Sequence, residues 1–525
     1  MIRVLLSLIL FGGVFIISHL FKEFLNPPKA YFLLISSLLL LIWCFVSRKG
    51  LQKLLDSLKS RGLYYGVAIV CLITSIYGLL QYFGFMTTFH HSFSITGAFE
   101  NPAGFATVQA AMFPLVFYLC FDKESSHLRQ SFALFVSIMC LVSVILSGSR
   151  MGFLGICAAI VVILAFTESV SSFFKTHRWV WIPIAVIIVS SLVVLYYLKK
   201  DSADGRLFIW ARSLELIKER PLFGYGYMGF QHNYMNAQAD YFRANPDSPY
   251  VMLADNVTQP FNEYIKLTVN YGLVGLAIAI ALFVLILRKL LKSDRQTKII
   301  GLSFMSSVFV MCQFSYPFMY DVLWFLCAIV FIPAFIGKSK ELFIPGYLRV
   351  LIPLLLLGGL FLSLRSMYYQ MKWTEISNRA DKGRVERMMP YYEEMKPVMK
   401  NNPFFFYNYA AELNALQRYQ ESNEFLMGCL RYWDDYNVQI LLADNYARMG
   451  QMDSAIVVCD QAFHMIPSRF EPLYRKMMIY GMSNDTVNAV KMAYEIIEKP
   501  VKVRSDQLRK MVSFAEQVVS RYDNE

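Results

Sequence analysis

Residues 264–287 read YIKLTVNYGLVGLAIAIALFVLIL, and this stretch decides the class of fold. It contains one charged side chain, Lys266, and no proline. As a helix it would be about 36 Å long, at about 1.5 Å per residue. The hydrocarbon core of a bilayer is about 30 Å thick, so the stretch is long enough and apolar enough to cross it once. The sequence therefore predicts a membrane-spanning helix here.

Ten further apolar runs make eleven predicted spans in all. Over the whole chain 56% of residues are hydrophobic and the mean hydropathy is +0.42, far above the average for soluble proteins. Seven of the nine cysteines lie in these runs and none forms a C-x-x-C pair, so we interpret them as packing residues. The sequence predicts an all-α, polytopic membrane helix bundle of about eleven transmembrane helices. The further runs are residues 4–21, 31–47, 64–85, 103–121, 131–148, 151–167, 179–198, 299–317, 321–337 and 347–364.

Basic loops alternate along the chain with loops that carry few positive charges. The positive-inside rule places the basic loops, and with them the N-terminus, in the cytoplasm. The first run lacks a small-x-small cleavage site, so we interpret it as a retained helix and not as a signal peptide. The loops 86–102, 148–150 and 199–263 then lie outside, as does the chain after Ser366, because eleven is an odd number. The basic loops are residues 48–63, 122–130, 168–178, 288–298 and 338–346.

The net charge of +12 does not indicate a nucleic-acid partner. From Arg365 onward 21 Lys and Arg balance 21 Asp and Glu, so the whole excess, 29 against 17, lies in the membrane part. There the positive residues are concentrated in short loops, where the positive-inside rule accounts for them. We therefore expect a lipid bilayer, and no nucleic acid, as the partner of the basic residues.

The C-terminal residues 365–525 form amphipathic helices separated by Pro and Gly, in contrast to the apolar runs of residues 1–364. Three small residues recur 33 and 34 residues apart, each near the start of a predicted helix. The spacing resembles tetratricopeptide repeats, in which small residues let paired helices pack closely. The alternative is an irregular helical bundle. We predict a transmembrane domain, 1–364, and a soluble repeat domain, 365–525, that could dock a protein partner. The small residues are Ser422, Ala455 and Ala489.

The predicted external loop, residues 199–263, is too long to be a simple connection. It opens with DSADGRLFIWARSLELIKERPLFGYG, in which apolar residues recur at helical spacing. Asp204 is a candidate N-cap, and Pro221 with Gly224 would end the helix. Arg206 would then lie beside the positive end of the helix dipole and near the lipid head groups, a place suited to a phosphate ligand. The alternative is an arginine that snorkels or forms a salt bridge.

Arg150, in SGSRMG, is a second unusual arginine, because it lies in a predicted external turn where positive charge is disfavoured. An arginine stays charged and can bind two phosphate oxygens with one planar fork. Two outward arginines near the bilayer surface could therefore hold a lipid-linked pyrophosphate. The alternative is an arginine that satisfies carbonyl groups at a helix end.

Three residues of the long loop have acid–base or hydrogen-bonding chemistry. Asn262 and Glu263 end the loop at the expected boundary between water and lipid. Glu263 could act as a general base toward a sugar hydroxyl, or could simply favour a helix N-terminus. His232, in GFQHNYMN, is the only histidine of this loop and is either a base or a surface residue.

Four segments, in this order, resemble those of the bacterial O-antigen ligase and polymerase family of membrane glycosyltransferases. The resemblance extends over roughly residues 60–335. It implies a glycan donor linked to undecaprenyl diphosphate, a glycan, lipid or protein acceptor, and transfer with no cofactor and no required metal. It also implies outward arginines that engage the pyrophosphate, and Arg150 and Arg206 match them. The segments are TGAFENPAGFA (96–106), SGSRMG (147–152), GRLFIWARSLELIKERPLFGYG (205–226) and FNEYIKLTVNYGLVGL (261–276).

One position departs from the pattern of the ligase branch. A histidine usually precedes the asparagine of the last motif in that branch, and here the residue is Phe261. The departure leaves open whether the chain resembles a ligase, a polymerase or a protein oligosaccharyltransferase. His232 or Glu263 could substitute as the base, or activation could rest on orientation and on the good diphosphate leaving group.

We therefore expect a glycosyltransferase of the bacterial inner membrane, acting at the periplasmic face in lipopolysaccharide or polysaccharide biosynthesis. One alternative is a transporter of lipid-linked glycans, which the scarcity of ionisable residues in the apolar runs disfavours. Another is a non-catalytic envelope scaffold that uses its repeat domain, an interpretation that the missing histidine favours.

Overall fold

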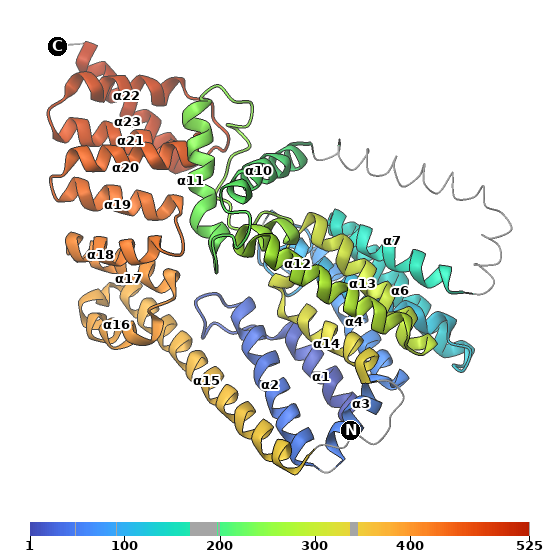
Figure 1. Cartoon of the computed structure of the whole chain (residues 1–525). Coiled ribbons are helices and arrows are strands. Elements are labelled where there is room, and N and C mark those ends of the chain that lie inside the picture. The colour runs from blue at the N-terminus through green and yellow to red at the C-terminus, as the bar shows by residue number, and fades with distance from the viewer. Residues whose placement is uncertain (48, 91, 168–196, 198–199, 337–344, 524–525) are drawn as a thin grey trace. The chain divides into compact units, whose positions relative to one another are not determined.

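The computed structural model describes residues 1–47, 49–90, 92–167, 197, 200–336 and 345–523. In these ranges helices are the only regular secondary structure (Figure 1), so the predicted all-α class is confirmed. The apolar helices are α1 (Ile2–Phe15), α2 (Asn26–Val46), α4 (Arg61–Tyr82), α5 (Pro102–Tyr118), α6 (His127–Leu146), α7 (Arg150–Ala165), α12 (Glu263–Leu291), α13 (Arg295–Phe314), α14 (Asp321–Ile336) and α15 (Gly346–Arg379). Short helices join them: α3 (Gly50–Leu58), η1 (Leu119–Phe121) and η3 (Pro317–Met319).

Seven of these apolar helices are long enough to cross a bilayer, and α1, α7 and α14 are shorter. Ten of the eleven predicted spans are therefore helices, and the predicted run 179–198, apart from Tyr197, lies outside the described residues. The chain is a polytopic helical membrane protein. The first helix is shorter than predicted, because the chain turns extended at Ile16 and the N–H of Ser18 bonds to the carbonyl of Phe24, at 3.0 Å.

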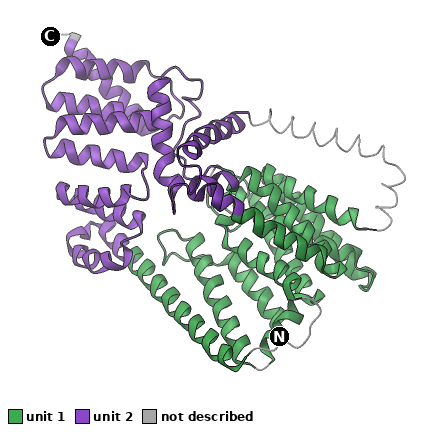
Figure 2. Ribbon diagram, in the orientation of Figure 1, with its two compact units in different colours: residues 1–195, 261–263, 278–374 green, residues 196–260, 264–277, 375–525 purple. Residues whose placement is uncertain are grey.

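The chain forms two compact units (Figure 2). The long loop groups with the C-terminal helices, whereas the sequence-based division at residue 364 places it with the membrane helices. The division into a transmembrane domain, 1–364, and a repeat domain, 365–525, therefore stays a prediction. Unit 1 comprises residues 1–195, 261–263 and 278–374, and unit 2 comprises residues 196–260, 264–277 and 375–525.

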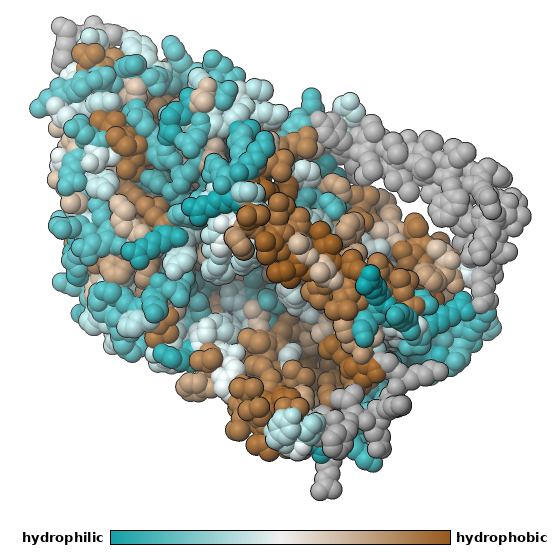
Figure 3. All heavy atoms as spheres, in the orientation of Figure 1, coloured by the Kyte–Doolittle hydropathy of each residue, from teal (hydrophilic) through white to brown (hydrophobic). Residues whose placement is uncertain are grey.

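Helix α5 is central to unit 1, where it packs against α4, α6, α7, α13 and α14. Its Gln109 donates to Ser75 Oγ on α4, at 2.6 Å, and accepts from Cys71 Sγ, at 3.1 Å, so this buried amide is satisfied within the bundle. In contrast, few side chains of α12 are buried, and most of its apolar side chains are at least partly exposed. On the face shown in Figure 3 apolar side chains dominate unit 1, as expected for helices that contact lipid, and polar ones dominate the C-terminal helices.

One end of unit 1 carries basic loops, and we call it the basic end. Contacts among side chains and backbone carbonyls join loops and helix ends here. Three of the loops that the charge pattern predicts to lie on one side of the membrane take part, residues 48–63, 122–130 and 288–298. The end of α7 lies there too. Three contacts define this end: Arg61 Nε to Asp122 Oδ2 (2.6 Å), Gln296 Nε2 to the carbonyl of Lys59 (2.9 Å) and an Arg295 guanidinium nitrogen to the carbonyl of Phe166 (3.1 Å).

Helix α12 is broken at Gly272, which has φ 65° and ψ −167°, so the span that the sequence predicts as one uninterrupted helix is wrong in this respect. The amides after the break find new partners. The N–H of Leu273 bonds to the carbonyl of Pro221 (2.7 Å) and that of Val274 to the carbonyl of Leu222 (3.1 Å). Because backbone carbonyls replace the lost helical acceptors, the break leaves these two donors paired.

Unit 2 contains two loop helices, the first segment of α12, and the C-terminal helices. The second members of three helix pairs, α18, α20 and α22, begin at Tyr419, Met452 and Thr486, which are 33 and 34 residues apart. The tetratricopeptide assignment stays a prediction. The helices are α10 (Lys200–Glu219), α11 (Gly229–Ala244), η4 (Ala380–Arg384), α16 (Val385–Met399), α17 (Pro403–Ala415), α18 (Tyr419–Leu430), α19 (Tyr436–Arg448), α20 (Met452–Met465), α21 (Glu471–Met482), α22 (Thr486–Glu498) and α23 (Asp506–Asp523).

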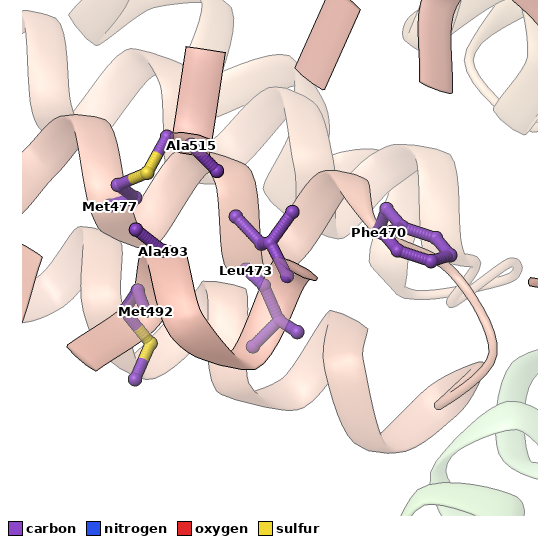
Figure 4. Close-up of a cluster of buried hydrophobic side chains, with 7 residues drawn as sticks. Phe470, Leu473, Met477, Met492, Ala493 and Ala515 are labelled. Carbon is purple, nitrogen blue, oxygen red and sulfur yellow. The ribbon is translucent and has the colours of Figure 1, made fainter. Parts of the chain in front are cut away.

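The small residues at the predicted repeat positions are buried between paired helices. Ser422 and Ala455 are fully buried, and Ser422 Oγ donates to the carbonyl of Ala410 on α17, at 2.7 Å. A larger side chain at either position would push the helices apart. Figure 4 shows the last pair and α23 closing over an apolar cluster: Phe470, Leu473, Met477, Met492, Ala493 and Ala515.

Candidate functional site

The end of unit 1 opposite the basic end contains all three predicted site residues of this unit. Arg150 is the first residue of α7, whose other end lies at the basic end. Asn262 and Glu263 lie beside the last turn of α13, which starts at the basic end. Arg150, Asn262 and Glu263 therefore share one end of the bundle. Arg150 is half-buried there, at the positive end of the α7 dipole, where an anion would be stabilised.

Asn262 and Glu263 both hold the backbone of neighbouring segments. Asn262 Nδ2 donates to the carbonyl of Gln313, at 3.1 Å, and its residue is 7% exposed. Glu263 Oε1 accepts from the N–H of Phe318, at 3.1 Å, in the short helix η3. These contacts fix the FNEY motif against the end of α13 and the short helix η3. One oxygen of the Glu263 carboxylate therefore has a structural role, because it accepts this backbone N–H.

Phe261 is in the left-handed region, with φ 54°. This conformation is uncommon for a bulky residue, and such outliers gather at active sites and ligand-binding segments. Its ring contacts that of Tyr316, with centroids 5.5 Å apart. The position at which the ligase branch carries a histidine thus lies at a strained point of the backbone, directly before Asn262 and Glu263.

A polar cluster continues from Tyr316 to the segment before α5. Asn101 Nδ2 lies 3.4 Å from Tyr316 Oη, and Tyr320 Oη donates to Asn101 Oδ1, at 3.2 Å. The half-buried Glu100 accepts from Asn101 Nδ2, at 3.3 Å, and from Asn26 Nδ2. Burial raises the pKa of the Glu100 carboxyl, against the opposing effect of the Asn26 hydrogen bond.

A lysine accompanies this carboxylate. Lys29, in the first turns of α2, is 3% exposed, donates to the carbonyl of Leu25, at 2.8 Å, and lies over the Phe99 ring, 5.3 Å from its centroid. Neither Glu100 nor Lys29 was among the sequence-predicted site residues. Glu100 stands in the TGAFENPAGFA motif, so the motif itself was a usable signal, whereas no local pattern marked Lys29.

The second arginine lies in unit 2. The structure describes α10 from Lys200, so Asp204 lies inside the helix and the predicted N-cap is wrong. Arg206 is consequently in the second turn, half-buried, and not at the helix start. The helix ends at Glu219, close to the predicted stop at Pro221. Another arginine of this helix, Arg212, is engaged structurally by Glu215 and the Tyr241 ring, at 2.8 Å and 4.2 Å.

His232 lies in the first turn of α11, also in unit 2. It is half-buried, and its Nδ1 is buried with no hydrogen-bond partner among the described residues. A positive charge on His232 would stabilise the carboxylate of Asp434, which lies near it and comes from the C-terminal helices. Sequence reasoning missed Asp434, because it lies 202 positions after His232 in the chain.

The predicted residues thus fall into two groups. Arg150, Asn262 and Glu263 share one end of unit 1, and Arg206 and His232 lie on neighbouring helices of unit 2, α10 and α11. The described residues contain no cluster of three or more His, Cys, Asp or Glu placed to hold a metal ion.

Residues 135–280 match the family model for O-antigen ligase. All five sequence-predicted site residues lie inside this O-antigen ligase segment, from Arg150 to Glu263. Glu100 and the C-terminal helices lie outside it. No curated protein matches the chain. The O-antigen ligase match supports a ligase or polymerase role in general, which fits a lipid-linked glycan substrate and a membrane setting.

Proposed function

We propose that the protein is a glycosyltransferase of the bacterial inner membrane that acts at the periplasmic face. It would transfer an oligosaccharide from undecaprenyl diphosphate to a hydroxyl group of a lipid core, a growing glycan or a protein. The observation that carries the proposal is the O-antigen ligase match, because the segment contains both unusual arginines and the FNEY motif.

In the proposed step an acceptor oxygen forms a bond to the anomeric carbon of the first sugar. The bond from that carbon to the diphosphate oxygen breaks, undecaprenyl diphosphate leaves with the electron pair, and the acceptor proton passes to a base. Arg150 and Arg206 would bind the pyrophosphate and stabilise the negative charge that develops on it. Arg150, at the start of α7, is supported in this role by its place at a helix N-terminus.

Three side chains are candidates for the base: His232, Glu263 and Glu100. Glu263 uses one oxygen to hold the N–H of Phe318, which favours a structural role. Glu100 accepts hydrogen bonds at both oxygens, but its donors, Asn101 and Asn26, are side chains that can rotate away, unlike a backbone N–H. Burial also raises the pKa of Glu100 toward the range in which a carboxylate is an effective base. Of the two carboxylates we therefore favour Glu100.

Chain connectivity supports placing the repeats on the same side of the membrane as the long loop. Residues 196–260 and 375–525 belong to one compact unit, so they must share a side. Four apolar helices, α12 to α15, lie between them, and an even number of crossings returns the chain to the side from which it left. If the basic loops lie in the cytoplasm, as we propose, that side would be the periplasm.

The test is to delete the gene and analyse lipid-linked and surface glycans in the native host. If the protein transfers the glycan, undecaprenyl-linked chains should accumulate in the deletion strain. The wild-type gene should restore their consumption, and a gene that carries Arg150→Ala should not. Arg129→Ala, which removes an exposed arginine from the start of α6, is the matched control and should restore it. Normal consumption in the deletion strain would argue for a scaffold, and lipid-linked chains trapped in the inner leaflet would argue for a transporter.

A further inference from the structure

The C-terminal helices of unit 2 are joined to α11 by a chain of hydrogen bonds. Asn236 of α11 donates to Asp434 Oδ2, at 2.8 Å, and accepts from Gln461 Nε2 of α20, at 2.7 Å. Asp434 Oδ1 in turn accepts from Gln439 Nε2, at 2.7 Å. In each of these three contacts an amide N–H donates to a side-chain oxygen, so the side chains of Asn236 and Asp434 are matched to their partners as donor and acceptor. Figure 1 shows α11 beside the ends of these helices.

Further contacts join α11 and the segment that follows it to the C-terminal helices. Gln238 of α11 is fully buried and donates to the carbonyl of Met465, at 2.6 Å, at the end of α20. Lys502 donates to the carbonyl of Ala254, at 3.0 Å, in the segment that follows α11. Burial raises the pKa of Asp434, while its two amide donors and the nearby His232 oppose that shift. A carboxylate removed from water in this way is stable only where its partners stay in place.

The N-terminal end of α11 is joined to the first segment of α12. The N–H of Phe230 donates to Asn270 Oδ1, at 2.9 Å, and the N–H of Gly226 donates to the carbonyl of Asn270. The backbone of Gly224 lies close to that of Val269: a Cβ on Gly224 would fall 2.4 Å from the carbonyl oxygen of Val269. Gly224 also has φ 63°, which favours glycine. Asn270 thus anchors α11 to the segment of α12 that begins at Glu263.

We propose that the C-terminal repeats act in cis as a clamp that grips α11 through the Asn236–Asp434 pair and, through Asn270, positions the first segment of α12. The surface of the repeats that faces α11 is then covered by this helix. The clamp can be tested without any activity. Its consequence for turnover, a displaced FNEY motif, rests on the proposed function.

The test uses the full chain in detergent, with a protease site inserted between the exposed Lys382 and Gly383. After cleavage we expect the C-terminal fragment to co-elute with the membrane part. Asn236→Asp should release it, because two carboxylates then face each other. Asp434→Asn should release it too, because the amide oxygen can take the place of only one carboxylate oxygen and its NH2 then faces the other donor, Asn236 or Gln439. Asn401→Asp makes the same change at an exposed residue and should retain the fragment.

The double variant with Asn236→Asp and Asp434→Asn gives the sharpest result. The new carboxylate at 236 would accept from Gln461 and from the new amide at 434, whose oxygen would accept from Gln439, so each hydrogen bond is restored. We expect the swap to restore co-elution that both single variants lose. Release of the wild-type fragment, or its retention in both single variants, would overturn the clamp whatever reaction the protein catalyses.

Discussion

Gly272 lies directly against the backbone of Leu222: a Cβ on Gly272 would fall 2.1 Å from the carbonyl oxygen of Leu222. Gly272 also has φ 65°, a conformation that L side chains rarely adopt. The break in α12 therefore needs glycine for two independent reasons, the close approach and the backbone angle. The segments on both sides of the break belong to regions that resemble O-antigen ligases.

Replacement of this glycine should be costly. Gly272→Ala is expected to lower the free energy of unfolding by about 1–3 kcal/mol or more, from backbone strain alone. Thermal unfolding in detergent, followed by the loss of the monodisperse elution peak, measures this. Gly358→Ala is the control, since nothing lies within 4 Å of a Cβ there, and it should leave stability unchanged or slightly higher. Equal stability of both variants would contradict the account of the break.

The pyrophosphate hypothesis predicts a strong charge requirement. Arg150→Ala and Arg206→Ala should each abolish glycan transfer with insertion and expression unchanged, and Arg→Lys should restore little, because a point charge cannot form the bidentate fork. Transfer of glycan from membranes that contain lipid-linked donor measures it. Lys218→Ala, at an exposed position of α10, should behave as wild type. Full activity of both alanine variants would end the hypothesis.

The base hypothesis predicts a distinct pH profile. If Glu100 takes the acceptor proton, Glu100→Gln should lower the transfer rate by about 10²–10⁴-fold with donor binding retained. The rate of the wild-type protein should rise with pH through the pKa of Glu100, which burial holds above the ordinary value of 4.5, because only the ionised carboxylate accepts a proton. Glu386→Gln, at an exposed position, is the control.

The same assay decides among the three candidates. If Glu100→Gln transfers glycan near the wild-type rate while His232→Ala or Glu263→Gln loses activity, the base is the residue whose replacement lowers the rate. Retained activity in all three variants would mean that orientation and the diphosphate leaving group suffice.

Position 261 offers a gain-of-function test. Phe261→His should not destabilise the fold, because histidine populates the left-handed region more readily than phenylalanine does, and φ is 54° here. If the site has lost only this residue, transfer to a ligase-type acceptor should increase. Phe93→His, at an exposed position of the segment between α4 and α5, is the control. A stable variant with unchanged transfer would show that the chain does not depend on a histidine at this point.

Topology is testable with reporter fusions. Fusions after Lys53 and Lys292 should report the cytoplasm, and fusions at Asn236 and after Gly450 should report the periplasm. The last two must agree, because α11 and the C-terminal helices form one compact unit. A cytoplasmic signal at both would reverse the proposed orientation, and opposite signals would contradict the unit itself.

The sequence by itself determined the class of fold. Apolar runs of about 20 residues have few alternatives to helices in a bilayer, so composition and length predicted ten apolar runs that are helices in the structure, seven of them long enough to cross a bilayer. The 33- and 34-residue spacing of Ser422, Ala455 and Ala489 likewise predicted where buried small residues lie between helices, because that periodicity is local.

Only the tertiary structure decided what the long loop packs against. Glu100 and Asn26, or His232 and Asp434, carry no mark of their proximity, since residues distant in the sequence meet through packing and not through local pattern. The break at Gly272 was equally hidden. Glycine is tolerated within membrane helices, and here the carbonyls of Pro221 and Leu222, supplied by another segment, make the interruption stable.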